Sequence, residues 1–385
     1  MTSTNAPTQN PANLLGLDYR AEVVPGGPVG TPPVPIIDAH CHINGGRAAR
    51  IFGQVMTAYG IERVYSMTVL DVAADVREAL GDRIRFMAVP RFTAKDKLTA
   101  FTTGYVDDLD IWHTEFGARI MKIWNAPRWR MFAKQIAGGA GHDPKDFVGL
   151  DSYWRRKHID KAVDLGMAIM VHTADPDTWY ATKYADTEFY GTKAEHTDEF
   201  EAFVERMAPR PIIGAHLCGL SEDLDRLDQL LTRHDNLYTD ASATKWIVRE
   251  ISKHEAERVR AFMTKWKGRV LFGSDIVTHD EHLESSDPDD TKFAVQLANT
   301  EGEAFDLYAS RYWALRTLWE RDWEGRSPIA DPDLAMVDPE RFDELSSPRL
   351  AGKALGRELL ETFYRGGAAE TFERWYDGEP VMPGG

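Results

Sequence analysis

Short apolar runs of the β type recur along the chain from residue 36 onward. Near-continuous apolar runs of four to eight residues are typical of strands that are buried on both faces of a sheet. The pattern predicts eight strands, at residues 35–40, 63–70, 83–90, 118–124, 167–173, 211–216, 236–242 and 269–275.

The segments between these runs have the spacing of amphipathic helices. The clearest is residues 221–234, where a stripe of four leucines follows a serine that would cap the helix: Ser221, Leu224, Leu227, Leu230 and Leu231. Strand and helix in alternation indicate a parallel sheet. Eight such units fit a (β/α)8 TIM barrel better than an open doubly wound sheet. No Gly-x-Gly-x-x-Gly turn follows an early strand, which disfavours dinucleotide binding.

The two ends of the chain depart from this alternation. Residues 1–35 are rich in proline, glycine, threonine and asparagine, which predicts a flexible N-terminal arm that wraps the domain. We expect residues 36–385 to form a single barrel domain, with a C-terminal helical extension from about residue 301 that packs against the outside of the barrel. Two connections, residues 125–150 and 174–196, are too long for ordinary loops and are expected to carry function.

Charge and composition narrow the classes of partner. The 385 residues are 43% hydrophobic and carry a net charge of -16, so we expect the protein to repel nucleic acid and anionic membranes and to act on a small-molecule substrate. Its two cysteines cannot form a disulfide framework. The N-terminus lacks the basic start and apolar run of a secretory signal, and no uninterrupted apolar segment reaches about 18 residues. We therefore expect a cytoplasmic protein.

The first predicted strand ends in two histidines one residue apart, His40 and His42. Residues two apart in a strand point to the same face, so the two imidazoles lie together at the C-terminal end of the strand. Three other predicted strands end in metal-binding residue types, at His172, His216 and Asp275. Active sites of barrels lie at this end. Neutral imidazoles and a carboxylate that converge from separate strands suit zinc or another first-row divalent metal.

Five motifs contain these residues in chain order: DAHCH at 38–42, MKIW at 121–124, VHTAD at 171–175, GAHLCG at 214–219 and LFGSDI at 271–276. Together they resemble the amidohydrolase superfamily, specifically the amidohydrolase-related branch that includes aminocarboxymuconate-semialdehyde decarboxylase. The resemblance spans about residues 36–280, and residues 358–372 are similar to the closing helix of the branch. It implies a metal-dependent barrel enzyme with four ligands, His40, His42, His172 and Asp275. It also implies one ion, most often zinc, or two ions if His216 is a ligand to a second metal rather than a catalytic group.

Other residues near the site each have two interpretations. By the same resemblance, Lys122 lies where two-metal members carry a carboxylated lysine that bridges the metals. It is alternatively an ammonium that pairs with Asp275 or with an anionic group of the substrate. Asp38 either fixes the tautomer of an imidazole or is a structural group in the barrel floor. His279 and His282 follow the last strand near the expected mouth, where most loop histidines are simply solvated.

The two long connections offer candidates for substrate binding. Residues 174–196 hold Trp179 and Tyr180 among other aromatic residues, and we interpret them as part of a lid or as a contact in a homo-oligomer. In the other connection, Arg128 and Arg130 could hold a carboxylate substrate by bidentate pairing, or they are ordinary surface residues.

The metal site is compatible with more than one reaction. A divalent ion lowers the pKa of bound water toward about 7, so the primary prediction is a metal-dependent hydrolase that cleaves a C–N or C–O bond of a small substrate. Lys122 favours this reaction because it resembles the lysine of the hydrolytic members. Asp275 would accept the proton of the water and His216 would stabilise charge on the carbonyl oxygen. The alternatives are non-oxidative decarboxylation or hydration of a small carboxylate, and a non-catalytic binding protein built on the barrel.

Overall fold

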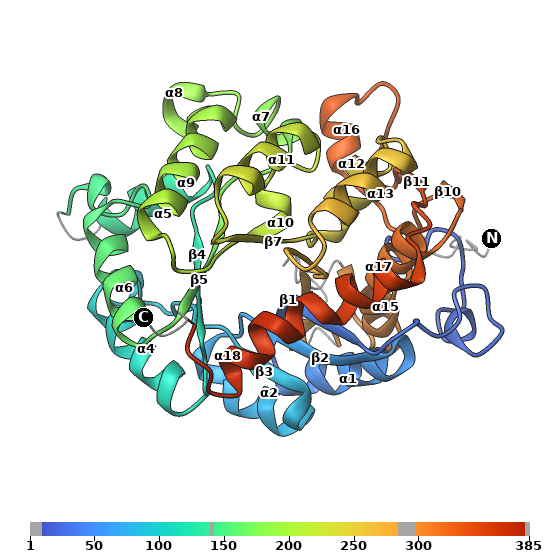
Figure 1. Cartoon of the computed structure of the whole chain (residues 1–385), viewed down its shortest axis with the longest axis horizontal. Helices are drawn as coiled ribbons and strands as arrows, with labels where there is room; N and C mark the ends of the chain where they lie inside the picture. Colours follow the sequence, from blue (N-terminus) through green and yellow to red (C-terminus); the bar gives the residue numbers. More distant parts are fainter. Residues whose placement is uncertain (1–9, 139–141, 284–296, 382–385) are drawn as a thin grey trace, which may run out of the picture.

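The computed structural model describes residues 10–138, 142–283 and 297–381. Residues 1–9 of the predicted arm and 139–141 of the first long connection lie outside the described residues. Parallel strands form two sheets, in the orders β3-β2-β1-β9 and β4-β5-β6-β7-β8 (Figure 1). The strands are β1 Ile36–Ile43, β2 Ile61–Ser66, β3 Ile84–Phe86, β4 Ile120–Trp124, β5 Ala168–His172, β6 Ile212–Gly214, β7 Leu237–Asp240, β8 Val270–Leu271 and β9 Ile276–Thr278.

Hydrogen bonds join the two sheets at both seams. At the first seam, the Ala88 N–H donates to the Ile120 carbonyl (2.8 Å) and the Lys122 N–H donates to the Ala88 carbonyl (2.9 Å). At the second, the Ala39 N–H donates to the Phe272 carbonyl at 2.9 Å. The eight predicted strands thus follow one another around a ring, and the prediction of a (β/α)8 barrel is confirmed.

Helices cover the outside of this ring (Figure 1). The larger ones are α1 Gly46–Tyr59, α2 Ala73–Leu80, α4 Thr103–Thr114, α5 Trp129–Gly138, α6 Tyr153–Asp164, α9 Lys193–Met207, α11 Leu224–Arg233, α12 Thr244–Ile251, α13 Ala256–Lys265 and α15 Glu301–Glu320. Short helices fill the connections and the C-terminal region: α3 Lys97–Ala100, α7 Asp177–Tyr180, α8 Thr187–Tyr190, α10 Ala215–Cys218, α16 Asp333–Val337, α17 Arg357–Glu361 and α18 Arg374–Tyr376. A small antiparallel pair, β10 Glu324–Arg326 and β11 Arg349–Ala351, lies among them.

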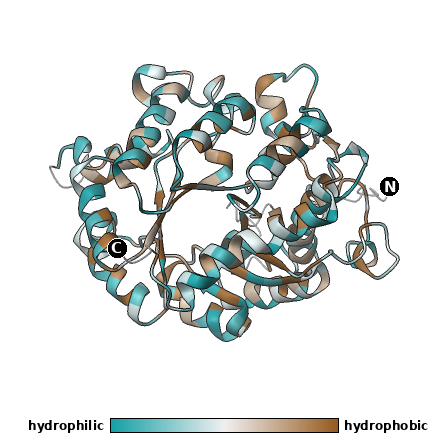
Figure 2. Ribbon diagram, viewed as in Figure 1, coloured by the Kyte–Doolittle hydropathy of each residue, from teal (hydrophilic) through white to brown (hydrophobic). Residues whose placement is uncertain are grey.

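The predicted amphipathic helix at 221–234 is α11, and all four of its stripe leucines are buried. Its cap differs from the prediction. Asp223, not Ser221, precedes the first helical residue, and its carboxylate accepts the Arg226 N–H at 2.9 Å. An aspartate satisfies the free N–H groups of a first turn as well as a serine does, and the helix begins two residues later than the serine would place it. Figure 2 shows hydrophobic residues along the strands and hydrophilic residues on the outer helices.

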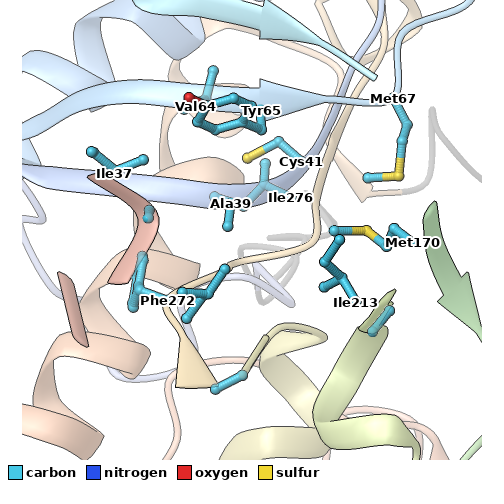
Figure 3. Close-up of a cluster of buried hydrophobic side chains, with 14 of the residues drawn as sticks. Ile37, Ala39, Cys41, Val64, Tyr65, Met67, Met170, Ile213, Phe272 and Ile276 are labelled. Carbon is cyan, nitrogen blue, oxygen red and sulfur yellow. The ribbon is translucent and has the colours of Figure 1, made fainter. Parts of the chain in front are cut away.

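Side chains alternate between the two faces of β1, and this alternation separates its hydrophobic core residues from its polar residues, which include the candidate metal ligands. Ile37, Ala39 and Cys41 belong to a cluster of buried hydrophobic side chains together with Met170 and Phe272 (Figure 3). Because successive side chains of a strand point to opposite faces, Asp38, His40 and His42 share the other face. Both cysteines are buried and free, so they serve here as small hydrophobic side chains.

The described part of the N-terminal arm packs against α15. Tyr19 and Val29 of the predicted arm are buried, and Glu22 accepts the indole N–H of Trp313 at 2.9 Å. Four residues of this part of the arm are thus buried, Ala12, Tyr19, Val23 and Val29, while the flexibility of the arm stays a prediction. In the described part of the chain, none of the helices is long and apolar enough to cross a bilayer. The cytoplasmic location stays a prediction.

Candidate metal centre

His40, His42 and Asp275 converge at the C-terminal end of the barrel strands. Asp275 Oδ1 lies 3.3 Å from His42 Nε2 and 3.5 Å from His40 Nε2. One donor atom of each residue lies within 4.8 Å of the other two, which is a spacing that could hold a metal ion. The side chain of His40 is fully buried, whereas His42 and Asp275 keep 28% and 24% exposure. The group is therefore anchored on one side and open to solvent on the other.

The backbone aims the Asp275 carboxylate at the two imidazoles. Asp275 has φ 58, in the left-handed region that non-glycine residues rarely adopt, and its N–H donates to the His40 carbonyl at 2.7 Å. His216 has a similar φ of 57, in the short turn α10 that follows β6. Such backbone strain costs free energy and persists where the surrounding structure imposes it, often at active sites. Neither conformation was expected from residues read as simple strand ends.

Asp240, a residue that the sequence reasoning missed, orients two of the histidines. Its Oδ2 lies 2.9 Å from His40 Nδ1, and its Oδ1 accepts the hydroxyl of Ser242. The Ser242 Oγ in turn lies 2.7 Å from His216 Nδ1. The signal that could have found Asp240 is its position as the carboxylate of the seventh predicted strand, NLYTDAS.

These contacts determine the tautomers of both rings. An ionised carboxylate only accepts, so His40 must donate from Nδ1, and Ser242 must donate to Asp240 and accept from His216 Nδ1. Burial alone would raise the pKa of Asp240, but His40, His216 and Lys122 together hold that pKa well below its ordinary value. Both histidines therefore keep a lone pair on Nε2, the form that binds a metal or accepts a proton.

Burial also keeps the two imidazoles neutral. It lowers the pKa of His40, with a further contribution from the charge of Lys122. It lowers the pKa of His216 well below its ordinary value, with a further contribution from His172. The neutral imidazole of His40, together with His42 and the Asp275 carboxylate, belongs to a donor set that fits a divalent cation.

His172 lies beside this group but is turned differently. Its ring is 4.5 Å from the ring of His216, centroid to centroid. Its Nε2 lies 2.8 Å from Asp175 Oδ1, and the second oxygen of Asp175 accepts the hydroxyl of Tyr184 at 2.7 Å. Among the described residues, the two triads that could hold a metal do not include His172. In this orientation only its Nδ1 is free to act as a ligand, and its role as one stays a prediction.

Lys122 points at the same group from β4. Its Nζ lies 3.4 Å from His40 Nε2, and the side chain is buried. Burial lowers the pKa of Lys122 to about 8, against the opposing charges of Asp240 and Asp275. Both interpretations of this lysine, a bridging group and a cation next to the substrate, are compatible with this position.

Asp38 takes the second of its two predicted roles. It accepts the backbone N–H groups of His40 and Ser274, both at 3.0 Å, and the hydroxyl of Tyr312 at 2.7 Å. It thereby ties β1 to the segment before Asp275 and to α15. Asp38 is a structural group of the barrel floor, and Asp240 is the residue that orients the imidazoles.

An aromatic wall, which we define as Trp246 of α12 and Trp179 of α7, stands over His216 and His172. The ring of Trp246 lies 5.7 Å from His216, 6.2 Å from His172 and 5.0 Å from Trp179. Trp179 lies in the aromatic connection that the sequence marks as a lid, whereas Trp246 carries no motif of its own. The predicted lid therefore reaches the metal centre through Trp246, a residue of α12.

The other predicted substrate residues lie apart from this wall. Tyr180 faces Tyr184 and His196, with ring centroids 5.6 and 6.3 Å away. Arg128 is exposed, and Arg130 donates to the Phe189 carbonyl at 3.1 Å. Their roles in substrate binding stay predictions.

The two histidines that follow β9 have different surroundings. Burial lowers the pKa of His279, the charge of Glu281 opposes that shift, and nearby His42 adds to it. His282 is buried and its Nδ1 lies 2.9 Å from the hydroxyl of Tyr308, so His282 belongs to the packing of α15.

Comparison of the sequence with family models and with curated proteins found no match. The structure is similar to that of 2,6-dihydroxybenzoate decarboxylase from Rhizobium, with 12% identity, a TM-score of 0.41 and coverage of 71% of this chain and 98% of that chain. It is also similar to 5-carboxyvanillate decarboxylase from Novosphingobium aromaticivorans complexed with manganese and 4-hydroxy-3-methoxy-5-nitrobenzoic acid, with 10% identity, a TM-score of 0.42 and coverage of 93% and 99%. A third similar structure is a probable 2-pyrone-4,6-dicarboxylic acid hydrolase from Acinetobacter baumannii with citric acid bound, with 10% identity, a TM-score of 0.38 and coverage of 79% and 99%.

The first two of these neighbours are decarboxylases, and the third is a probable hydrolase. At these identities and TM-scores the likeness assigns neither a substrate nor a reaction to this chain. The chemistry that follows therefore rests on the chain's own residues.

Proposed function

We propose that this protein is a metal-dependent enzyme that holds a single divalent ion on His40, His42 and Asp275 and catalyses the non-oxidative decarboxylation of a small carboxylate. The orientation of the histidines is the observation that carries the proposal. His40 takes part in both triads of the described residues, so these triads are alternatives for one ion. A second ion would need further ligands, and His172 Nε2 is already bonded to Asp175.

His216 then has no metal to bind and is free for proton transfer. A divalent ion on the three ligands would supply a Lewis acid that stabilises negative charge on a substrate oxygen. His216 Nε2, which Ser242 leaves with a lone pair, takes a proton from an acidic group of the bound substrate. It returns this proton to the carbon that loses carbon dioxide.

The proton balance of this reaction is simple. One carbon–carbon bond breaks, its electron pair stays on the ring or chain carbon, and one carbon–hydrogen bond forms there. One proton from water is consumed for each carbon dioxide released. Asp240 stabilises the positive charge of the His216 imidazolium through the Ser242 hydroxyl, as a carboxylate does behind a catalytic imidazole.

Hydrolysis, the primary prediction from the sequence, is the second candidate. Lys122 is the observation that favours it, because its Nζ is buried 3.4 Å from His40 Nε2, where a carboxylated lysine could bridge two ions. In that case Asp275 would accept the proton of the attacking water and His216 would stabilise the carbonyl oxygen.

Metal content per chain, measured by elemental analysis with bicarbonate present, tests the proposal. A single ion, together with carbon dioxide release from a panel of small carboxylates, is the expected result. Two ions, with turnover of esters, amides or lactones, would support hydrolysis instead. A chain that binds no metal would contradict both reactions and favour the binding-protein alternative. The sequence predicts zinc, but imidazole and carboxylate donors also suit other first-row ions, so the same measurement identifies the metal.

A matched pair of variants tests the ligands. We expect His40→Ala to lose the metal. His113→Gln, on α4 and outside both triads, should retain it. Retention of full metal content by His40→Ala would refute the ligand assignment. A small-molecule substrate is part of this proposal, and homo-oligomerisation stays a prediction.

A further inference from the structure

A buried cluster of charges surrounds Arg249 on α12, away from the metal centre. The guanidinium, 3% exposed, donates to Glu250 (2.6 Å), Asp333 (3.3 Å) and Asp331. Buried charges are costly unless they are paired and hydrogen-bonded, so this cluster holds its members in one arrangement. Two of its carboxylates, Asp331 and Asp333, come from the C-terminal extension.

The same cluster reaches the predicted lid. Asp333 Oδ2 accepts the indole N–H of Trp179 at 2.7 Å, and Lys183 Nζ lies 3.5 Å from Asp333 Oδ1. The ammonium of Lys183 also lies 3.3 Å above the ring of Trp179. Arg249 donates to the hydroxyl of Thr178 at 3.1 Å. Two side chains outside the lid, those of Asp333 and Arg249, thus bind three residues of the lid: Thr178, Trp179 and Lys183.

The lid segment needs such contacts because α7 contains only four residues, Asp177–Tyr180. A helix of one turn is unstable by itself, since nucleation is costly and few backbone hydrogen bonds offset it. Its position must come from tertiary contacts.

Arg249 also connects the cluster to the metal centre through its own helix. Trp246 lies three residues before Arg249 on α12, and it contacts Trp179 on one side and His216 on the other. Asp333 thus holds Trp179 directly, whereas Arg249 bonds Thr178 and so joins α7 to α12, the helix that carries Trp246. We propose that Asp333 and Arg249 are positioning residues that hold Trp179 against Trp246 and so complete the substrate site, an inference that rests on the proposed function. The C-terminal extension is then part of the site, not only a packing element.

We call the contacts of Asp333 and Arg249 with Thr178, Trp179 and Lys183 the latch. Hydrogen–deuterium exchange of the metal-loaded chain tests whether these contacts hold the lid. In Asp333→Ala, we expect amides of residues 177–184 to exchange about tenfold faster or more, because a hydrogen bond to a charged acceptor is lost. Trp179→Phe keeps an aromatic ring, although a smaller one, and removes the N–H donor, so it should accelerate the same amides. The double variant should exchange no faster than the faster single variant. Asp338→Ala, on the same C-terminal segment, is the control and should leave this exchange unchanged.

Turnover supplies the second measurement. We expect KM to rise about tenfold in Asp333→Ala with a smaller change in kcat, and Asp333→Asn, which keeps an acceptor for Trp179, to recover part of the affinity. Unchanged exchange at 177–184, or equal acceleration throughout the chain, would overturn the latch. The exchange measurement needs no turnover. An unaltered chain that releases no carbon dioxide from any carboxylate therefore refutes the proposed function alone, while its exchange data still decide the latch.

Discussion

Asp240 lies 200 residues from His40 in the sequence, and its Oδ2 is 2.9 Å from His40 Nδ1. Through the Ser242 hydroxyl the same carboxylate also orients His216. A ligand and a proton-transfer group thus depend on one side chain, and the loss of that side chain would affect both.

The first prediction concerns this carboxylate. We expect Asp240→Asn to weaken metal binding about 10- to 100-fold, because an amide can present its N–H to His40 and favour the wrong tautomer. Competition with a chelator of known affinity measures the change. Asp235→Asn, at an exposed position before β7, is the matched control. Equal affinity in both variants would show that Asp240 does not orient the ligand.

Lys122 separates the two candidate reactions. Under the single-ion proposal, Lys122→Met should keep its ion, since the side chain is not among the three ligands. Under the two-ion alternative, the same variant should lose one ion and its dependence on bicarbonate. Elemental analysis distinguishes these outcomes, with Lys157→Met, an exposed lysine on α6, as the control.

A pH effect on stability should arise at His158, far from the metal centre. Burial, and then the charge of Arg155, lower the pKa of His158 from 6.5 to about 3. Because this histidine is neutral in the folded protein, its contribution is fully present above pH 6.5. It is lost as the pH falls toward about 3, since the unfolded chain takes up a proton that the folded chain does not.

Urea unfolding at several pH values measures this effect. Over that interval the free energy of unfolding should fall by up to about 1.4 kcal/mol per pH unit through this one group. His158→Gln keeps a donor for the Thr102 carbonyl and should remove this part of the slope. His142→Gln, at an exposed position, should leave the slope as it is. A slope that is the same in all three proteins would contradict the assignment.

The cap of α11 gives a test of local structure. Asp223→Ala should lower the free energy of unfolding by about 1 kcal/mol, because the Arg226 N–H loses its acceptor. Ser221→Ala should cost less than Asp223→Ala, since the Ser221 hydroxyl donates to the neighbouring Glu222 and, within the described part of the chain, accepts no N–H of the first turn of α11. Thermal or urea unfolding of the two variants decides between the caps, and a larger loss for Ser221→Ala would restore the cap that the sequence predicted.

Local periodicity explains why much of this architecture could be predicted. The eight apolar runs lie within a few residues of the observed strands, and the leucine stripe of α11 is buried. The positions of His40, His42 and Asp275 at the C-terminal end of the barrel follow from the same pattern, because parallel strands bring their ends to one face.

The sequence by itself therefore determined the strands, the barrel and the residue types at its mouth, since these depend on neighbours a few positions apart. Tertiary structure alone decided which nitrogen of each imidazole is free, because Asp240 and Asp175 hold their histidines by hydrogen bonds whose direction depends on side-chain orientation. It also placed Trp246 against His216 and tied the C-terminal Asp333 to Trp179. Trp179 and Asp333 are 154 positions apart, and a contact over that separation produces no periodic pattern in the sequence. Only the folded protein brings such pairs together.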